Sequence, residues 1–320
     1  MIAGLSRTRL FPKEGSMTRR LIFICAVSLF GASFQQPQRT PLDSVKNRID
    51  AITKSVNATW GIYIKSLDTG EEIAINADEQ MDTMSVIKIP LMVEAYRQAS
   101  EGKFKLTDMH VLKKSEIQPG TGILQRWAEG TTMSLNDIID LMIIVSDNTA
   151  TDIMFQQVGG PEAVNKLMDS YGYDKIRASG LAADWFKALR ERNDNAAFHR
   201  EAKHPFGLAT PHQIGLLLEK IEKGEAVNKD ASSQMLQHMR GQLYATRIPR
   251  YLALTPFPSR PPHKTGDFLP YIGNDVGVLE GSGKRVVVSI FTANHFGNGF
   301  MLEDAIGRVT EQVADYFGSK

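Results

Sequence analysis

Residues 59–75, TWGIYIKSLDTGEEIAI, hold two short apolar runs with a turn between them. The runs are 59–64 and 72–75, and the glycine of Asp68-Thr69-Gly70 lies in the turn. Apolar runs rich in Ile, Tyr and Trp that flank such a turn predict a β-hairpin. A second pair of runs, 275–279 and 285–293, flanks a glycine-containing turn near the other end of the chain. Predicted hairpins therefore lie near both ends.

Helical periodicity dominates between these hairpins. Apolar residues recur at helical spacing through 85–223, and amphipathic segments cover 42–55 and 301–317. Strands at both ends with helices inserted between them predict an α/β fold of the α+β type, with one antiparallel sheet flanked by helices. We expect a single domain over 42–320, with an α/β part at 42–84 and 224–320 and an inserted all-helical part at 85–223.

The N-terminus has the pattern of an export signal. Residues 17–20 (MTRR) precede an apolar run at 21–32, and small residues follow for cleavage, while the residues before Met17 form an upstream extension. The run is too short to be a good membrane span. We expect residues 1–33 to be removed, 34–41 to form a linker, and the mature protein to be periplasmic or secreted, without stable membrane insertion.

Composition narrows the classes of partner. The chain has 320 residues, and 42% of them are apolar, so it can bury a large core. Its formal net charge is +1, which gives no excess of basic residues that would indicate nucleic-acid binding. Its one cysteine, Cys25, lies in the predicted signal. His199, Glu201 and His204 lack a third ligand cluster, and we interpret them as loop residues rather than a metal site. We expect a monomer without cofactor or metal.

Three short motifs follow one another along the chain: Ser85-x-x-Lys88, Ser146-Asp147-Asn148 and Lys264-Thr265-Gly266. Average residue frequencies give about one accidental Ser-x-x-Lys in such a chain, but only about 0.05 accidental copies of each of the other two. Ser100-x-x-Lys103 lies in a polar, glycine-containing stretch, and we interpret it as the accidental copy. Ser85 instead precedes an apolar run that predicts a buried helix, with Ser85 and Lys88 on one face.

With the three motifs in this order, the chain resembles the class A β-lactamase family. The resemblance extends over about 45–317 and includes residues 130–135 before the second motif, 208–211 after the family's Ω-loop, and Asn274-Asp275 after the third motif. It implies the β-lactamase and transpeptidase fold. It also implies a β-lactam or a peptidoglycan-like peptide as the substrate.

The serine of the first motif is the predicted nucleophile. Ser85 Oγ needs a base within hydrogen-bond reach. Lys88 can be that base if burial and the like charge of Lys264 lower its pKa. Ser146 can relay a proton to the leaving nitrogen, with Lys264 orienting its hydroxyl. We therefore predict Ser85, Lys88 and Ser146 as catalytic residues.

The remaining motif residues suit substrate binding. Asn148 can hold Lys88 and a substrate amide, while the Lys264 cation and the Thr265 hydroxyl suit a substrate carboxylate. The resemblance implies that the strand past Gly266 places the backbone N–H of Asp267 in an oxyanion hole with that of Ser85. The carboxylate of Asp267 departs from the family, where small neutral residues are usual at this point.

The loop after the second motif departs further from the family pattern. Class A enzymes carry Glu-x-x-Leu-Asn there, and this glutamate activates the water that frees the acyl-enzyme. This chain lacks that string and has Ala182 or Ala183 near the glutamate position, with Asp184 beside it. We predict Glu191, four residues before Asn195, as the substitute base. The alternative is that Glu191 is a solvated residue in a charge run.

The leading hypothesis is a serine hydrolase that is acylated at Ser85 by β-lactams and hydrolyses them. One alternative is a D-Ala-D-Ala peptidase or transpeptidase-like enzyme, which uses the same motifs without the loop glutamate. The other is a protein that captures a β-lactam or muropeptide covalently and does not turn it over. The lifetime of the acyl-enzyme separates the hydrolase from the covalent trap.

Overall fold

The computed structural model describes residues 42–191, 205–258, 260–281 and 283–320. The predicted signal at 1–33, the linker at 34–41, and His199, Glu201 and His204 lie outside the described residues. The helices are α1 Leu42–Ser55, α2 Lys88–Ser100, α3 Leu135–Ile144, α4 Asn148–Val158, α5 Pro161–Ser170, α6 Ala182–Arg190, α8 Pro211–Glu222, α9 Lys229–Arg240 and α10 Gly299–Gly318, with 3₁₀ turns η1 Met84–Ile87, η2 Lys114–Glu116, η3 Leu124–Arg126 and η4 Ile248–Leu254. The strands are β1 Thr59–Ser66, β2 Glu72–Ile75, β3 Met81–Asp82, β4 Met109–Val111, β5 Thr132–Ser134, β6 Arg177–Ala178, β7 Gly207–Ala209, β8 His263–Phe268, β9 Ile272–Gly281 and β10 Lys284–Ala293.

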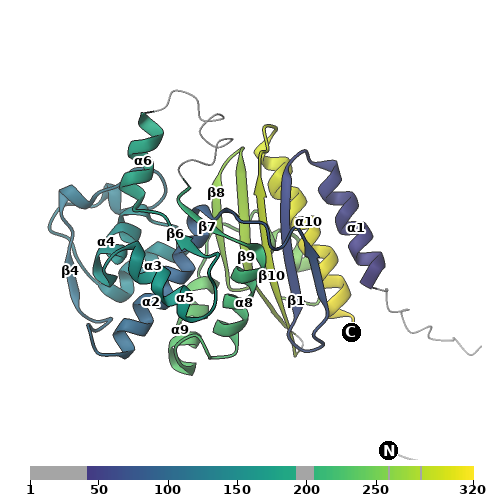
Figure 1. The fold of residues 1–320 in the computed structure, drawn as a ribbon, viewed down its shortest axis with the longest axis horizontal. Coiled ribbons are helices and arrows are strands. Elements are labelled where there is room, and N and C mark those ends of the chain that lie inside the picture. The colour runs from purple at the N-terminus through teal and green to yellow at the C-terminus, as the bar shows by residue number, and fades with distance from the viewer. Residues whose placement is uncertain (1–41, 192–204, 259, 282) are drawn as a thin grey trace, which may run out of the picture. The chain divides into compact units, whose positions relative to one another are not determined.

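The main sheet joins the two ends of the domain. Its strand order is β2-β1-β10-β9-β8, and each neighbouring pair is antiparallel (Figure 1). Ile62 on β1 lies opposite Ile290 on β10 and Ile75 on β2, so the N-terminal hairpin pairs with the C-terminal one through β1 and β10. Gly70 adopts a positive φ of 74° in the first hairpin turn. The predicted α+β fold, with one antiparallel sheet built from both chain ends, is confirmed.

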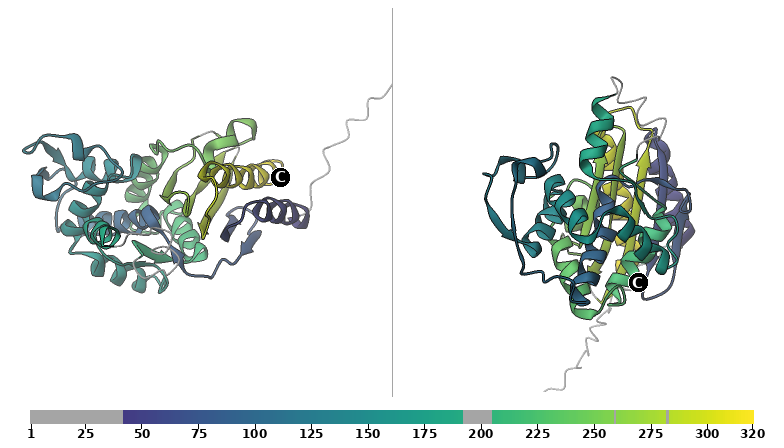
Figure 2. Two further views of the ribbon diagram at one scale, coloured as in Figure 1. Left: turned by 90° about the horizontal axis from the view of Figure 1, so that it is seen from above. Right: turned by 60° about the vertical axis from the view of Figure 1, so that its left-hand side comes forward.

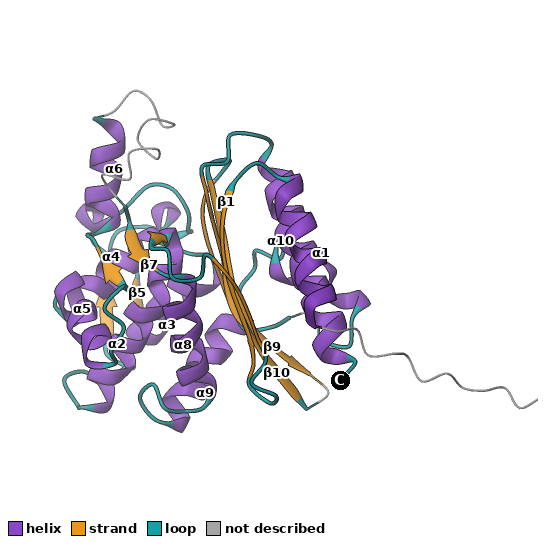
Figure 3. Cartoon of the chain, turned by 45° about the vertical axis from the view of Figure 1, so that its right-hand side comes forward, coloured by secondary structure: helices purple, strands orange, loops and turns teal. Residues whose placement is uncertain are grey.

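Helices cover both faces of this sheet (Figure 3). Side chains alternate along β10: Val286, Val288 and Ile290 enter the core shared with α1 and α10, whereas Val287 and Phe291 enter the core shared with the helical part. Because successive residues of a strand point to opposite faces, an apolar run such as 286–291, interrupted only at Ser289, is the pattern of a strand buried on both sides. The sheet thus holds two separate cores together.

The helical part surrounds α2. This helix contacts α3, α4, α5 and α9, which lie around it (Figure 2). It is buried along most of its length, and its buried residues include the polar Lys88, Glu94 and Gln98. We predicted the helical part to end at 223, but α9 follows and contacts α3 and α8, so the helices continue to Arg240. No helix within the described residues is both long and apolar enough to cross a membrane.

Candidate active site

Ser85 lies in the turn that starts the central helix. It belongs to η1, and α2 begins three residues later at Lys88, as predicted. Ser85 is half-buried and lines a cavity of about 550 Å³. Its hydroxyl has no hydrogen-bond partner among the residues that the structure describes. Met84, directly before it, has a φ of +46°, a strained conformation of the kind that clusters at functional sites.

Lys88 is fully buried behind the cavity. Its Nζ lies 2.7 Å from the backbone oxygen of Ser146, 3.0 Å from Ser146 Oγ and 3.0 Å from Asn148 Oδ1. Burial, reinforced by the charge of Lys264, lowers the pKa of Lys88 well below its usual value. The side chain predicted as the base therefore has the environment that favours its neutral form.

The three contacts of Lys88 fix the direction of one hydrogen bond. A neutral amine has two N–H groups and one lone pair. The Ser146 carbonyl and Asn148 Oδ1 can only accept hydrogen bonds, so they take the two N–H groups. The lone pair then faces Ser146 Oγ, which is both a donor and an acceptor. When Lys88 is neutral, the Ser146 hydroxyl therefore donates to it.

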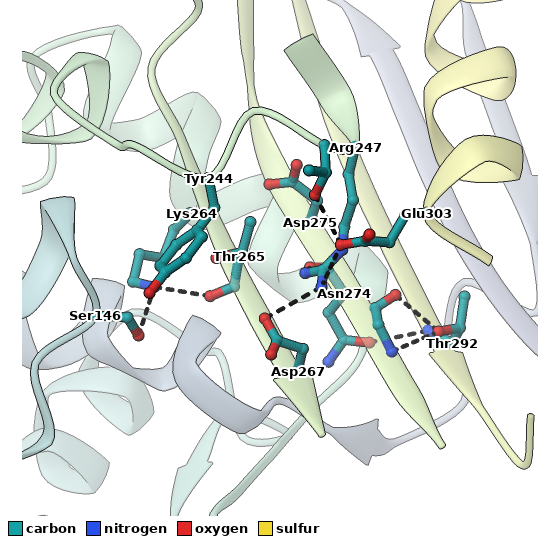
Figure 4. Close-up of polar contacts among 12 residues, drawn as sticks. Ser146, Tyr244, Arg247, Lys264, Thr265, Asp267, Asn274, Asp275, Thr292 and Glu303 are labelled. Carbon is teal, nitrogen blue, oxygen red and sulfur yellow. Dashed lines mark hydrogen bonds and ion pairs between the residues drawn. The ribbon is translucent and has the colours of Figure 1, made fainter. Parts of the chain in front are cut away.

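Ser146 connects the two buried lysines. Lys264 Nζ donates to Ser146 Oγ at 3.0 Å (Figure 4). The same hydroxyl contacts Lys88. Ser146 adopts a positive φ of 56°, which a non-glycine residue holds only when its surroundings impose it. Its carbonyl accepts hydrogen bonds from Lys88 Nζ and from Thr121 Oγ1, both at 2.7 Å. These contacts hold the hydroxyl in its bridging position.

The other two residues of the second motif have separate roles. Asp147 caps α4 and its Oδ2 accepts hydrogen bonds from the backbone N–H groups of Ile123 and Leu124, at 2.7 and 2.8 Å. Asp147 thus holds the start of α4 against the segment at 123–124. Asn148 accepts from Lys88 and donates to the backbone oxygen of Pro119 at 3.1 Å, and it lines the cavity.

Lys264 is buried in β8. Besides Ser146 Oγ, its Nζ donates to the backbone oxygen of Thr265 at 2.8 Å. Burial lowers its pKa to about 7, although the carboxylates of Asp267 and Asp275 act in the opposite direction. Lys264 and Thr265 lie behind the residues that line the cavity rather than among them. The carboxylate-binding role of these two residues stays a prediction.

Gly266 lets the edge strand approach the nucleophile. A Cβ at this position would lie 2.4 Å from the backbone oxygen of Thr83 and 3.0 Å from the backbone nitrogen of Ser85. Contact this close excludes any side chain, so only glycine allows β8 to lie against η1. β8 is the outer strand of the sheet, and an edge strand leaves alternate N–H groups unpaired. The oxyanion hole predicted for the N–H groups of Ser85 and Asp267 is compatible with this arrangement.

Comparisons with known proteins agree with this geometry. The family model described as the beta-lactamase enzyme family matches residues 44–317, which is most of the described chain. The chain belongs to the beta-lactamase enzyme family. The resemblance to class A β-lactamases is thereby confirmed, and the membership supports a hydrolase acting on β-lactams.

Three similar proteins span nearly the whole domain. Beta-lactamase VEB-1 of Pseudomonas aeruginosa is 22% identical, covering 93% of this chain and 98% of its own. A crystal structure of a β-lactamase from Sphaerobacter thermophilus is 29% identical, with a TM-score of 0.73 over 86% of this chain and 96% of that one. An acyl-enzyme complex of a PBP-A variant with penicillin G is 22% identical, with a TM-score of 0.73 over 89% of this chain and 100% of that one. These proteins share the fold.

The loop helix α6 gives the β-lactamase-like cavity an apolar wall. Ala182, Trp185 and Phe186 line the cavity from this side. The ring of Trp185 lies 5.2 Å from that of Phe186 and 5.3 Å from that of Phe268 on β8, edge to face in both cases. Aromatic pairs of this geometry add about 0.5–1.5 kcal/mol beyond their buried area. They close the cavity between the loop and the sheet.

Asp152 fixes the start of that helix. Its carboxylate accepts hydrogen bonds from the backbone N–H groups of Ala182 at 2.6 Å and Ala183 at 3.0 Å. Burial raises the pKa of Asp152 to about 6 despite these hydrogen bonds. The bonds place Ala182, near the position where class A enzymes carry the deacylating glutamate, directly on the cavity wall.

The predicted deacylation base lies elsewhere. Glu191 caps the C-terminal end of α6, where it is exposed and does not line the cavity. Asp184, the other candidate, is also exposed and accepts a hydrogen bond from the backbone N–H of Leu181 at the start of the same helix. The placement of Glu191 therefore gives its predicted role no support, and its position matches the alternative of a solvated residue.

Several cavity residues were not predicted from the sequence, and three of them form a polar group. Tyr244, Arg247 and Glu303 line the cavity together with Ser85 and Asp267. They come from the segment before η4 and from α10, and none belongs to a motif. The one sequence signal that could have pointed to them is the unusual carboxylate of Asp267, from which no charged partner was predicted.

Proposed function

We propose that the protein is a serine enzyme that β-lactams acylate at Ser85 and that releases the acyl group slowly. One observation carries the acylation step: the Ser146 hydroxyl bridges two buried lysines beside the cavity that Ser85 lines. Such a bridge holds a base, a proton relay and a cation in fixed positions, which general acid–base catalysis requires.

The acylation step follows from these positions. Ser85 Oγ attacks the carbonyl carbon of the β-lactam, and its proton passes to the neutral amine of Lys88 as the lone pair of that amine turns from Ser146 Oγ to Ser85 Oγ. Ser146 receives a proton from Lys88 and gives its own to the ring nitrogen as the C–N bond breaks. The backbone N–H groups of Ser85 and Asp267 stabilise the oxyanion, a contribution that is worth about 3–4 kcal/mol per donor in other acyl-transfer enzymes.

The slow release follows from the composition of the cavity wall. Hydrolysis of the ester needs a base that holds and deprotonates a water. Within the described part of the loop after the second motif, the residues on the cavity wall are alanine and aromatic residues, without a carboxylate. The carboxylates of Asp267 and Glu303 do line the cavity, but both are ion-paired with Arg247. We further expect the protein to act as an exported monomer.

Acylation should depend on the protonation of Lys264. Its pKa of about 7 means that it is cationic below neutral pH and loses its charge as the pH rises. We expect the second-order rate constant for acylation by penicillin G, an anion, to fall above about pH 7, since this constant reports the free enzyme. This rate constant is measured from labelling reactions that are stopped at successive times, at pH values below and above 7.

Lys264→Arg is the matched variant for that measurement, because a guanidinium stays charged throughout the range. The fall above neutral pH should disappear in this variant. An identical fall in the variant and the wild type would show that another group titrates.

The proposal as a whole is tested by a pulse of fluorescent penicillin followed by a chase with unlabelled penicillin. We expect the protein to be labelled, and we expect the label to persist for much longer than one catalytic turnover of an ordinary β-lactamase. Rapid loss of the label would overturn slow release, and absence of label would overturn acylation.

A further inference from the structure

Arg247, Asp267 and Glu303 lie in a row along one wall of the cavity, and we call these three residues the charged wall. Arg247 Nη2 lies 3.2 Å from Asp267 Oδ2 and 3.2 Å from Glu303 Oε1, so one guanidinium bridges two carboxylates (Figure 4). Its Nη1 donates to the backbone oxygen of Asn274 at 2.9 Å. The three residues come from β8, the segment before η4, and α10.

The charged wall carries an excess negative charge. Two carboxylates and one guanidinium leave one carboxylate uncompensated. The Arg247 side chain is only 3% exposed, whereas that of Asp267 is 35% and that of Glu303 15% exposed. A molecule in the cavity therefore meets the carboxylates more readily than the cation between them.

The guanidinium of Arg247 has one donor that none of these contacts uses. Arg247 Nε is buried and has no hydrogen-bond acceptor among the residues that the structure describes. Buried donors in native proteins are nearly always paired. Because this N–H is buried, the charged wall presents the carboxylate oxygens to the cavity, and these suit a cation.

The excess charge lies close to the predicted carboxylate-binding residue. Asp267 raises the pKa of Lys264 and Arg247 lowers it, so both act on Lys264 electrostatically. A substrate carboxylate placed at Lys264 would feel the uncompensated charge of the charged wall as a repulsion. A cation beside that carboxylate would instead be attracted by the charged wall, so the electrostatic interaction of the ligand with the wall would become favourable.

Structural contacts account for the geometry of the charged wall but not for its net charge. Glu303 Oε1 also accepts a hydrogen bond from Thr246 Oγ1 at 2.7 Å. The segment around Arg247 is already held by the Nη1 bond to Asn274 and by the hydrogen bond from the backbone N–H of Ile248 to Asp275 Oδ2 at 3.0 Å. One carboxylate would neutralise the guanidinium. The second places a net charge in the cavity, where it costs affinity for an anion.

We propose that the charged wall is a subsite for a cationic substituent next to the substrate's carboxylate, so that the protein prefers zwitterionic β-lactams to anionic ones. This inference rests on the proposed acylation of Ser85. The cation pairs with the excess carboxylate of Asp267 and Glu303, while the substrate's carboxylate lies toward Lys264. Specificity of this kind combines an attraction for one ligand with a repulsion for its competitor.

Two cephalosporins form a matched pair for the test. Cephalothin and cephaloridine share the thienylacetyl side chain and the ring carboxylate, but the substituent at C3 is neutral in the first and a permanent pyridinium cation in the second. Competition with fluorescent penicillin gives the rate constant for acylation by each of them. Comparing their ratio between variants cancels the intrinsic reactivity of the two rings.

Asp267→Asn should lower the ratio of cephaloridine to cephalothin acylation about tenfold, because it removes one charge at short range in a partly buried site. Glu303→Gln should lower the same ratio and serves as the second variant if Asp267→Asn does not fold. Asp230→Asn, on the exposed first turn of α9, makes the same charge change away from the cavity and should leave the ratio unchanged.

The outcomes separate the two proposals. If both cephalosporins acylate Ser85 and neither Asp267→Asn nor Glu303→Gln changes the ratio, the cation subsite is wrong while the proposed function stands. If neither compound nor the fluorescent penicillin labels the protein, the proposed function and this inference are both overturned.

Discussion

Ser85→Ala should abolish covalent labelling by a fluorescent penicillin and leave the fold intact. The Ser85 hydroxyl oxygen is the atom that bonds to the β-lactam carbonyl carbon, so its removal abolishes acylation instead of slowing it. Within the described residues this hydroxyl makes no hydrogen bond, and the side chain is half-buried, so we expect a change of less than about 1 kcal/mol in the free energy of unfolding. Gel fluorescence and a thermal melt measure the two effects.

Ser100→Ala is the matched control for that prediction. Ser100 begins the accidental Ser-x-x-Lys copy, lies exposed at the end of α2, and donates to the backbone oxygen of Arg97 at 2.7 Å. Its replacement should leave labelling unchanged. Labelling that survives in Ser85→Ala would show that another residue is the nucleophile.

The second large effect is a gain of function. Ala182→Glu should speed the release of the penicilloyl group by about a hundredfold, because a positioned general base contributes about 10²–10⁴ to such a step. Ala182 lines the cavity, and Asp152 holds its backbone N–H at 2.6 Å. The backbone that carries the new carboxylate would therefore be held in place on the cavity wall. The rate of label loss during a chase measures release.

Two variants control for the position and the chemistry of the new carboxylate. Ala182→Gln adds the same bulk without a strong base, and its release rate should stay near that of the wild type. Glu191→Gln removes a carboxylate from the exposed end of the same helix, and it should also change nothing. A marked slowing in Glu191→Gln would restore Glu191 as the base and contradict our interpretation of the cavity wall.

The fold was predictable from local patterns. The amphipathic segments at 42–55 and 301–317 and the two hairpins recur in the structure with nearly the expected bounds. Each has a signal within a few residues: helical spacing, or apolar runs around a glycine turn. The catalytic motifs were predictable for a similar reason, since Ser85 and Lys88 are one helical turn apart and need no distant information. Their proximity to Ser146 and Lys264 followed from the family resemblance.

The cavity walls were not predictable in the same way. Arg247 and Glu303 are 56 residues apart in sequence and meet only because η4 and α10 contact each other beside β8. Glu303 follows buried Leu302 on a helix whose apolar face gives no hint of an ion pair at the cavity. The orientation of Glu191 depends on where α6 ends, and helix ends are the least certain feature of a sequence pattern.

Intact mass spectrometry of the wild-type protein during exposure to penicillin G tests the central claim most directly. We predict that the mass rises by that of one penicillin, that the adduct maps to the peptide containing Ser85, and that it persists after free penicillin is removed. A protein whose mass never changes while the antibiotic stays intact, or an adduct on any other residue, would contradict the account.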